Sequence, residues 1–234
     1  MFQFKQFAVD QSECAMKINT DGVLLGALAL ANDPKSISDI GTGTGVIALM
    51  LAQRFPNGKI DAVEIDKAAA ATASSNFKES KFAGRVTGYH LGFEDYFQQN
   101  PEQKYDLIVS NPPFYIDSLK SPGEQRTIAK HTDEQFFDIL LSTTARQLTG
   151  TGLLWLILPV STSLVVQEIA KGYELYLHTQ INIRSYPQSY PHRHIIAFSL
   201  TESFTSIGDF TIYDEPKKYT AQYEAALKEF FTIF

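Results

Sequence analysis

The sequence predicts an α/β fold built on a doubly wound, mostly parallel sheet. From residue 35 onward, short apolar segments typical of buried strands alternate with segments of helical periodicity. A glycine-rich turn over 41–45 joins the first of these strands to its helix. Such alternation is typical of βαβ units, whose strands lie parallel in one sheet. The 234 residues, 44% of them hydrophobic, are enough for one large domain with a sizeable core.

Seven strands and several helices follow from the apolar pattern. The strands are expected over 35–40, 59–65, 85–91, 106–110, 152–158, 175–183 and 194–200, and the helices over 46–55, 66–79, 132–147 and 163–170. The tail is expected to add a short strand over 210–213 and an amphipathic helix over 220–231. Ligands of such sheets bind outside the carboxyl ends of the strands, so the turns after the first, second and fourth strands are where a site is predicted.

Composition and charge limit the class of protein. Residues 1–34 are expected to form an N-terminal extension that packs on a domain over 35–234. A single cysteine, Cys14, fits a reducing cytosol, and no apolar run is long enough to span a membrane. The formal net charge of −6 argues against diffuse binding to nucleic acid but leaves room for a local basic site. We therefore expect a cytoplasmic monomer without a membrane partner.

The glycine turn and the second strand together predict a nucleotide-binding site. Gly41 and Gly43 allow a tight turn and a close approach of ligand, although the turn on its own is equally explained as a strand–helix connection. Glu64 ends the second strand, where an acidic residue meets a ribose diol in nucleotide-binding sheets. A carboxylate there would repel phosphate, so S-adenosylmethionine fits this site. The alternatives are a solvated acid at Glu64, and Asp66 in its place, although Asp66 is better explained as the N-cap of the next helix.

A second turn, Asn111-Pro112-Pro113-Phe114, follows the fourth strand. Its prolines remove two N–H donors, the Asn111 amide offers an acceptor, and Phe114 offers a flat face for stacking. These groups suit a planar group that carries an NH2, whose lone pair would be exposed to an electrophilic methyl by orientation alone. The alternative is an ordinary Asn-Pro surface turn. No His, Cys or carboxylate spacing matches a zinc site, so no metal is expected.

The motifs DIGTGTG (39–45), VEID (63–66) and NPPF (111–114) resemble those of class I S-adenosylmethionine-dependent N-methyltransferases. Segments at both ends of the chain and one in its middle resemble a single subfamily, the bacterial tRNA1(Val) (adenine(37)-N6)-methyltransferases. The segments are 2–7, 16–26, 126–131, 219–220 and 230–231. The resemblance implies a seven-stranded Rossmann-like methyltransferase sheet. It also implies methyl transfer from S-adenosylmethionine to N6 of adenine 37 in a tRNA anticodon loop, with valine tRNA as the substrate.

The resemblance also implies a role for each motif residue. Lys17, Thr20 and Asp21 would close over the methionine end of the cofactor, which Asp39 and Gly41 would also contact. Gly43 is likewise expected to bind the cofactor. Glu64 would hold the ribose hydroxyls. Asp95 would lie beside the cofactor adenine, with a helix or turn cap as the equal alternative. Asn111, Pro112, Pro113 and Phe114 would hold the target amine.

Two basic segments are candidates for contact with RNA. One, over 120–131, contains Arg126 and Lys130, and the other, over 171–194, contains Arg184 and Arg193 among tyrosines and prolines. Charged segments are more often solvated faces, which is the alternative for both. Other functions also remain open at this stage: a protein glutamine N5-methyltransferase, a DNA adenine-N6 methyltransferase, and a non-catalytic RNA-binding module.

Overall fold

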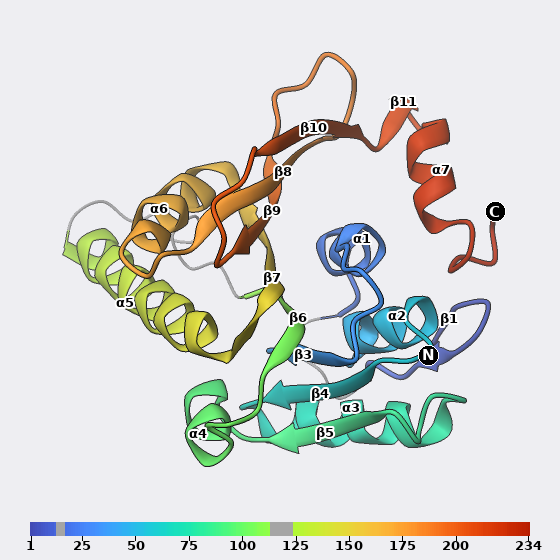
Figure 1. The fold of residues 1–234 in the computed structure, drawn as a ribbon. Coiled ribbons are helices and arrows are strands. Elements are labelled where there is room, and N and C mark those ends of the chain that lie inside the picture. The colour runs from blue at the N-terminus through green and yellow to red at the C-terminus, as the bar shows by residue number, and fades with distance from the viewer. Residues whose placement is uncertain (13–16, 113–123) are drawn as a thin grey trace.

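The computed structural model describes residues 1–12, 17–112 and 124–234, without the side chains of 124–133. Cys14, Pro113 and Phe114 therefore lie outside the described residues. In the described part of the chain, a single large sheet is covered by helices on both faces, as Figure 1 shows. None of the helices described is both long and apolar enough to cross a membrane.

The sheet confirms the predicted α/β class. Its order is β10 (Ser206–Thr211), β8 (Tyr176–Arg184), β9 (Arg193–Ser199), β7 (Leu148–Pro159), β6 (Tyr105–Ser110), β3 (Ser36–Ile40), β4 (Lys59–Glu64) and β5 (Val86–His90). β9 runs antiparallel to β7 and β8, and the other neighbouring pairs are parallel. The described residues thus form eight sheet strands. Seven match the predicted core strands, and the eighth, the edge strand β10, overlaps the short tail strand predicted over 210–213.

Two helical layers enclose the sheet. One hydrophobic core lies beneath α1 (Thr20–Leu28), α2 (Val46–Arg54), α3 (Lys67–Glu79) and α7 (Ala221–Leu227), and the other beneath α4 (Phe93–Gln99), α5 (Glu124–Gln147) and α6 (Val160–Lys171). In β6, Leu107 and Val109 belong to the first core and Ile108 to the second. Burial on both faces explains why the central strands are almost continuously apolar in sequence.

Residues 1–34 share the first of these cores. The hairpin of β1 (Phe2–Gln3) and β2 (Ala8–Val9) contributes Phe4 and Val9. Phe4 also forms a bridge with Phe231, so the two ends of the chain lie together. Helix α1 was not predicted, because its buried stretch Val23-Leu24-Leu25 shows no helical alternation of polar and apolar residues. Asn19 fixes its start, since Oδ1 accepts a hydrogen bond from N of Gly22.

Several element boundaries differ from the predicted ones. β7 extends to both sides of 152–158, and α6 begins at Val160, directly after Pro159. β10 begins at Ser206, before the predicted 210–213, because exposed edge residues need no apolar alternation. The remaining tail forms the short hairpin of β11 (Tyr213–Glu215) and β12 (Lys218–Tyr219) before α7.

Candidate functional site

A cavity of about 390 Å³ opens at the carboxyl edge of the sheet, a size within the usual range for small-molecule sites. The sheet order reverses between β3 and β6, so the cavity lies at the topological switch point. It is lined by the turns after four strands: Gly41 and Gly43 after β3; Glu64, Ile65 and Asp66 after β4; Leu91, Gly92, Phe93 and Glu94 after β5; and Asn111 and Pro112 after β6.

The glycines of the first turn divide into two kinds. Gly41, Gly43 and Gly45 all have positive φ, at 69°, 56° and 84°. A Cβ on Gly41 or Gly43 would meet nothing within 4 Å. A Cβ on Gly45 would lie 2.7 Å from Cζ of Phe77 and closer still to Cε1. Gly45 therefore permits packing against α3, whereas Gly41 and Gly43 leave backbone open to the cavity for a ligand.

Glu64 is held in place by the two turns on either side of it. Its Oε2 accepts a hydrogen bond from N of Gly43 at 2.9 Å, and its Oε1 accepts one from N of Asp66, also at 2.9 Å. Each carboxylate oxygen keeps further capacity to accept, which suits a diol. Asp66 is the N-cap of α3, because its Oδ1 accepts from N of Ala69. That interpretation of Asp66 is confirmed.

Asp39 lies beneath the glycine turn, outside the cavity lining. Its Oδ2 accepts hydrogen bonds from Oγ1 of Thr42 at 2.6 Å and from N of Ala48 at 3.1 Å. Full burial raises the pKa of this carboxyl to about 7. Asp39 thus ties the turn to the start of α2, and its predicted contact with the cofactor stays a prediction.

Asn111 and Pro112 face the cavity from the end of β6, opposite the Glu64 turn. The start of α1 lies against Asn111: a Cβ built on Gly22 would be 3.6 Å from Nδ2 of Asn111. The cavity therefore places Asn111 and Glu64 in one space, as the strand-end argument predicted.

The other predicted cofactor residues near α1 lie differently. Lys17 and Thr20 are exposed and do not line the cavity. Asp21 accepts a hydrogen bond and ion pair from Arg193, with Nε 2.8 Å from Oδ2. The structure thus brings Asp21, predicted to bind the cofactor, into direct contact with Arg193, predicted to bind RNA.

Asp95 is exposed in the first turn of α4 and does not line the cavity, whereas its neighbours Phe93 and Glu94 do. Sequence reasoning missed Glu94 and Ile65. Ile65 is 74% exposed where it lines the cavity. In the sequence, neither residue carried a signal beyond its place after a strand end.

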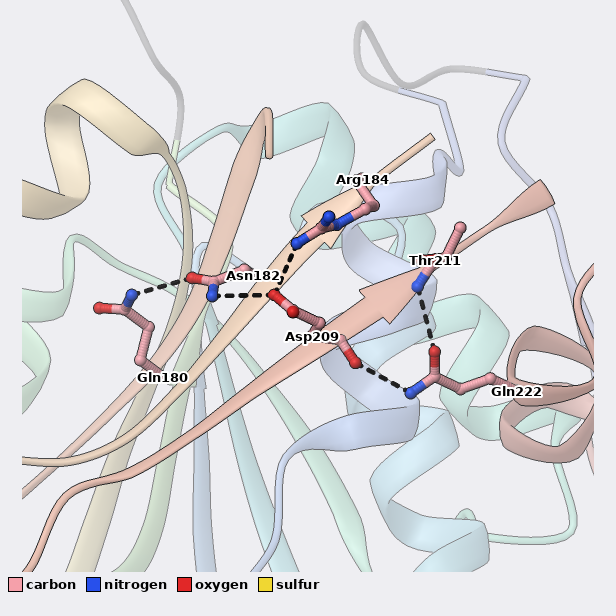
Figure 2. Close-up of polar contacts among 6 residues, drawn as sticks. All are labelled: Gln180, Asn182, Arg184, Asp209, Thr211 and Gln222. Carbon is pink, nitrogen blue, oxygen red and sulfur yellow. Dashed lines mark hydrogen bonds and ion pairs between the residues drawn. The ribbon is translucent and has the colours of Figure 1, made fainter. Parts of the chain in front are cut away.

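Arg184 belongs to a polar network at the outer edge of the sheet, drawn in Figure 2. Its Nη2 donates to Oδ1 of Asp209 at 2.8 Å, and Nδ2 of Asn182 donates to the same oxygen. The Gln222 side chain on α7 bonds the backbone of β10 at O of Asp209 and N of Thr211. Arg184 thus has a bond within the protein, and contact with RNA remains a prediction for it.

Two further predicted contacts cannot be placed. Arg126 and Lys130 belong to α5, but their side chains lie outside the described residues. No group of three or more His, Cys, Asp or Glu side chains within the described ranges is arranged to hold a metal ion.

Comparison with known proteins gives a consistent family. The family model "Methyltransferase small domain" matches residues 17–163. A tRNA1(Val) (adenine(37)-N6)-methyltransferase of Pedobacter heparinus is 46% identical over 100% of this chain and 98% of its own length. Proteins of the same name from Flavobacterium johnsoniae and Bacteroides thetaiotaomicron are 42% and 40% identical, over 99% and 97% of this chain and 99% and 98% of their own.

Solved structures share the fold at lower sequence identity. A predicted O-methyltransferase from Agrobacterium tumefaciens superposes with a TM-score of 0.68 at 16% identity, over 90% of this chain and 96% of its own. A methyltransferase from Pyrococcus furiosus superposes with a TM-score of 0.57 at 20% identity, over 81% of this chain and 90% of its own.

Proposed function

Because the chain belongs to the tRNA1(Val) (adenine(37)-N6)-methyltransferase family, we propose that it methylates N6 of adenine 37 in the anticodon loop of a valine tRNA. The methyl donor is S-adenosylmethionine, and the enzyme works in the cytoplasm, where tRNA is modified. The observation that carries the proposal is the cavity of about 390 Å³ that holds Glu64 and Asn111 together.

The residues of the cavity fit S-adenosylmethionine. Gly41 and Gly43 leave backbone free of side-chain obstruction, and Glu64 offers oriented carboxylate oxygens to a ribose diol. Phe93 and Ile65 supply apolar surface for a nucleobase. The chemistry supplied by the bound cofactor is an electrophilic methyl group. We assign the methionine end to the side of Gly41, with Asp39, Lys17, Thr20 and Asp21 as candidate neighbours and Asp95 as a candidate neighbour of the adenine.

Asn111 orients the target amine. Its amide oxygen accepts one N–H of the adenine N6, and a carbonyl of the proline-rich turn accepts the other, because Pro112 and Pro113 have no N–H to occupy it. Phe114 stacks on the base. These contacts would direct the amine lone pair towards the methyl group of a bound cofactor, and the proton lost from N6 would pass to solvent. Orientation and electrostatics lower the barrier without a strong base.

The RNA is held outside the cavity by cationic residues. Arg126, Lys130, Arg184 and Arg193 are the candidates, and the last two lie at the carboxyl edge of β8 and the start of β9. A base in a loop is already partly unstacked, so extruding it into a pocket costs little.

The test is methylation of purified transcripts followed by digestion to nucleosides and mass spectrometry. We expect N6-methyladenosine in valine tRNA, and none in a transcript whose adenine 37 is replaced by guanine. Methyl label found in protein glutamine or in DNA, with none in tRNA, would refute the proposal and support one of the alternatives that share the same turn.

A further inference from the structure

Arg193 occupies a rigid position beside the proposed active site. It is the first residue of β9, and its backbone lies opposite Pro159 of β7 and Ile183 of β8. Its side chain turns towards α1, where Nε donates to Oδ2 of Asp21 at 2.8 Å. The two side chains are 28% and 20% exposed, so this ion pair is better shielded from water than an ordinary surface pair.

The ion pair lies close to Asn111, because Asp21 directly precedes the residue that contacts the Asn111 side chain. Asp21 lies in the first turn of α1, immediately before Gly22. Gly22 lies against the Asn111 amide, because a Cβ built on it would be 3.6 Å from Nδ2. The contacts thus run in sequence from the sheet at Arg193, through Asp21 and Gly22, to the side chain that orients the target amine.

We propose that Arg193 is a positioning residue for methyl transfer, acting through Asp21 to hold the first turn of α1 against Asn111. The inference rests on the proposed function, since Asn111 is the group whose orientation matters. Gly22 and Val23 are buried and fix the inner side of this turn, whereas Asn19 and Thr20 on its outer side are exposed. The ion pair of Asp21 adds a constraint on the outer side, and small displacements of orienting groups lower the rate strongly.

The guanidinium group is suited to this task. While Nε binds Asp21, Nη1 of Arg193 donates to O of His192 at 3.0 Å. Bonds from two different nitrogens fix the plane of the group, which the single ammonium of a lysine cannot do. Arg193→Lys keeps the positive charge but not this geometry, so it should preserve only part of the positioning of Asp21.

A double-mutant cycle separates positioning from direct contact with RNA. The variants are Asp21→Asn, Arg193→Gln and the combination of both, assayed for kcat and for the KM of valine tRNA. If Arg193 acts through Asp21, each single variant lowers kcat about tenfold and the combination also lowers it about tenfold, since both remove one interaction. If Arg193 instead binds phosphate, Asp21→Asn removes one competitor for its guanidinium, kcat stays unchanged, and only Arg193→Gln raises the KM.

Further measurements keep the result interpretable. Calorimetry with S-adenosylhomocysteine should give a dissociation constant within about threefold of the wild type for Arg193→Gln, because local pair effects do not extend to separate sites. A larger change that also appears in Asp21→Asn reports the candidate contact of Asp21 with the cofactor and is read separately from kcat. Lys35→Gln is the matched control, since it removes a largely exposed ion pair with Asp33 at the amino edge of the sheet and should leave kcat unchanged. If Arg193→Gln loses its native circular dichroism spectrum, Arg193→Lys replaces it in the cycle, with a lowered kcat and retained tRNA KM expected.

The two hypotheses fail in different ways. Absence of N6-methyladenosine with the wild-type enzyme refutes the proposed function. An active wild type whose two substitutions multiply to about a hundredfold loss of kcat, as independent sites do, refutes the positioning role of Arg193.

Discussion

The two halves of the sheet's carboxyl edge use their polar groups in different ways. In the half formed by β3, β4 and β5, Gly41 and Gly43 are open to the cavity and Glu64 keeps capacity to accept hydrogen bonds from a ligand. In the half formed by β8, β9 and β10, the cations are bonded within the protein, Arg193 to Asp21 and Arg184 to Asp209. The first half is prepared for a small ligand before that ligand arrives.

If the second half contacts the tRNA, as proposed, its arginines meet a large, strongly charged partner while they are already bonded within the protein. A pre-bonded arginine costs less conformational entropy when it meets a phosphate than a free one does. It also gives up part of its attraction for phosphate to the carboxylate it already contacts. Large effects of substitution are therefore expected in the first half. In the second half, a small effect that depends on salt is expected at Arg184, whereas Arg193 is expected to act on kcat through Asp21.

The largest effect should come from the residue at the boundary of the two halves. Asn111→Ala removes the acceptor proposed to orient the target amine, and we expect kcat to fall about 10²–10³-fold, as for loss of one preorganised hydrogen-bonding group. S-adenosylhomocysteine affinity, measured by calorimetry, should stay near that of the wild type. A parallel loss of cofactor affinity would mean that the turn is structural.

Substitutions in the glycine turn should affect either packing or ligand binding, depending on which glycine is changed. Gly45→Ala places a methyl group into the Phe77 ring at positive φ, and we expect the free energy of unfolding to fall by about 2–4 kcal/mol. Gly43→Ala carries the same backbone strain without the overlap. Gly43→Ala should therefore lower the free energy of unfolding less than Gly45→Ala does in denaturant titrations. It should lower the affinity for S-adenosylhomocysteine more. Equal losses of stability would remove the distinction between the two glycines.

Glu64→Ala should make the binding free energy of S-adenosylhomocysteine less favourable by about 1–3 kcal/mol, the range for hydrogen bonds to a charged group. Asp66→Asn is the matched control, because asparagine still caps α3 and the ribose assignment leaves Asp66 without a ligand contact. Calorimetry that finds equal affinities for Glu64→Ala and the wild type would contradict the ribose role.

Asp39 should make the stability of the first half depend on pH. Burial raises its pKa to about 7 from the usual 3.8, so the folded state binds more protons than the unfolded state between these values. Stability therefore falls as the pH rises from about 4 to about 7 through this group. Asp39→Asn should flatten that slope in denaturant unfolding curves recorded across this range. If the free energy of unfolding depends on pH as steeply in Asp39→Asn as in the wild type, groups other than Asp39 cause that dependence.

The smallest effects are expected at Arg184, whose partner Asp209 is 61% exposed at its side chain. If Arg184 contacts RNA, Arg184→Gln should raise the tRNA KM by about two- to fivefold and reduce the salt dependence of that KM by about one phosphate contact. Asp209→Asn should lower the KM by releasing the cation. A KM that neither substitution changes would restrict Arg184 to the network of Figure 2.

Local sequence pattern was enough to predict which residues lie together at the carboxyl ends of β3, β4 and β6. Strand ends, glycine spacing and residue type predicted that Gly41, Gly43, Glu64 and Asn111 share one site, and the cavity contains all four. These inferences succeed because parallel strands end at the same edge, so separate turns converge without further information. Asp66 was recognised as a cap because capping depends on only a few neighbouring residues.

Pairing between distant segments could not be predicted. Asp21 and Arg193 lie 172 positions apart, and nothing local to either residue marks the other as its partner. The same holds for the edge strand β10, whose exposed residues lack alternation and whose backbone is bonded by Gln222 of α7. By itself, the sequence determined the α/β class, the turns that form the site and the chemistry they suit. Only the tertiary structure decided which cations already have partners, because that depends on which surfaces packing brings together.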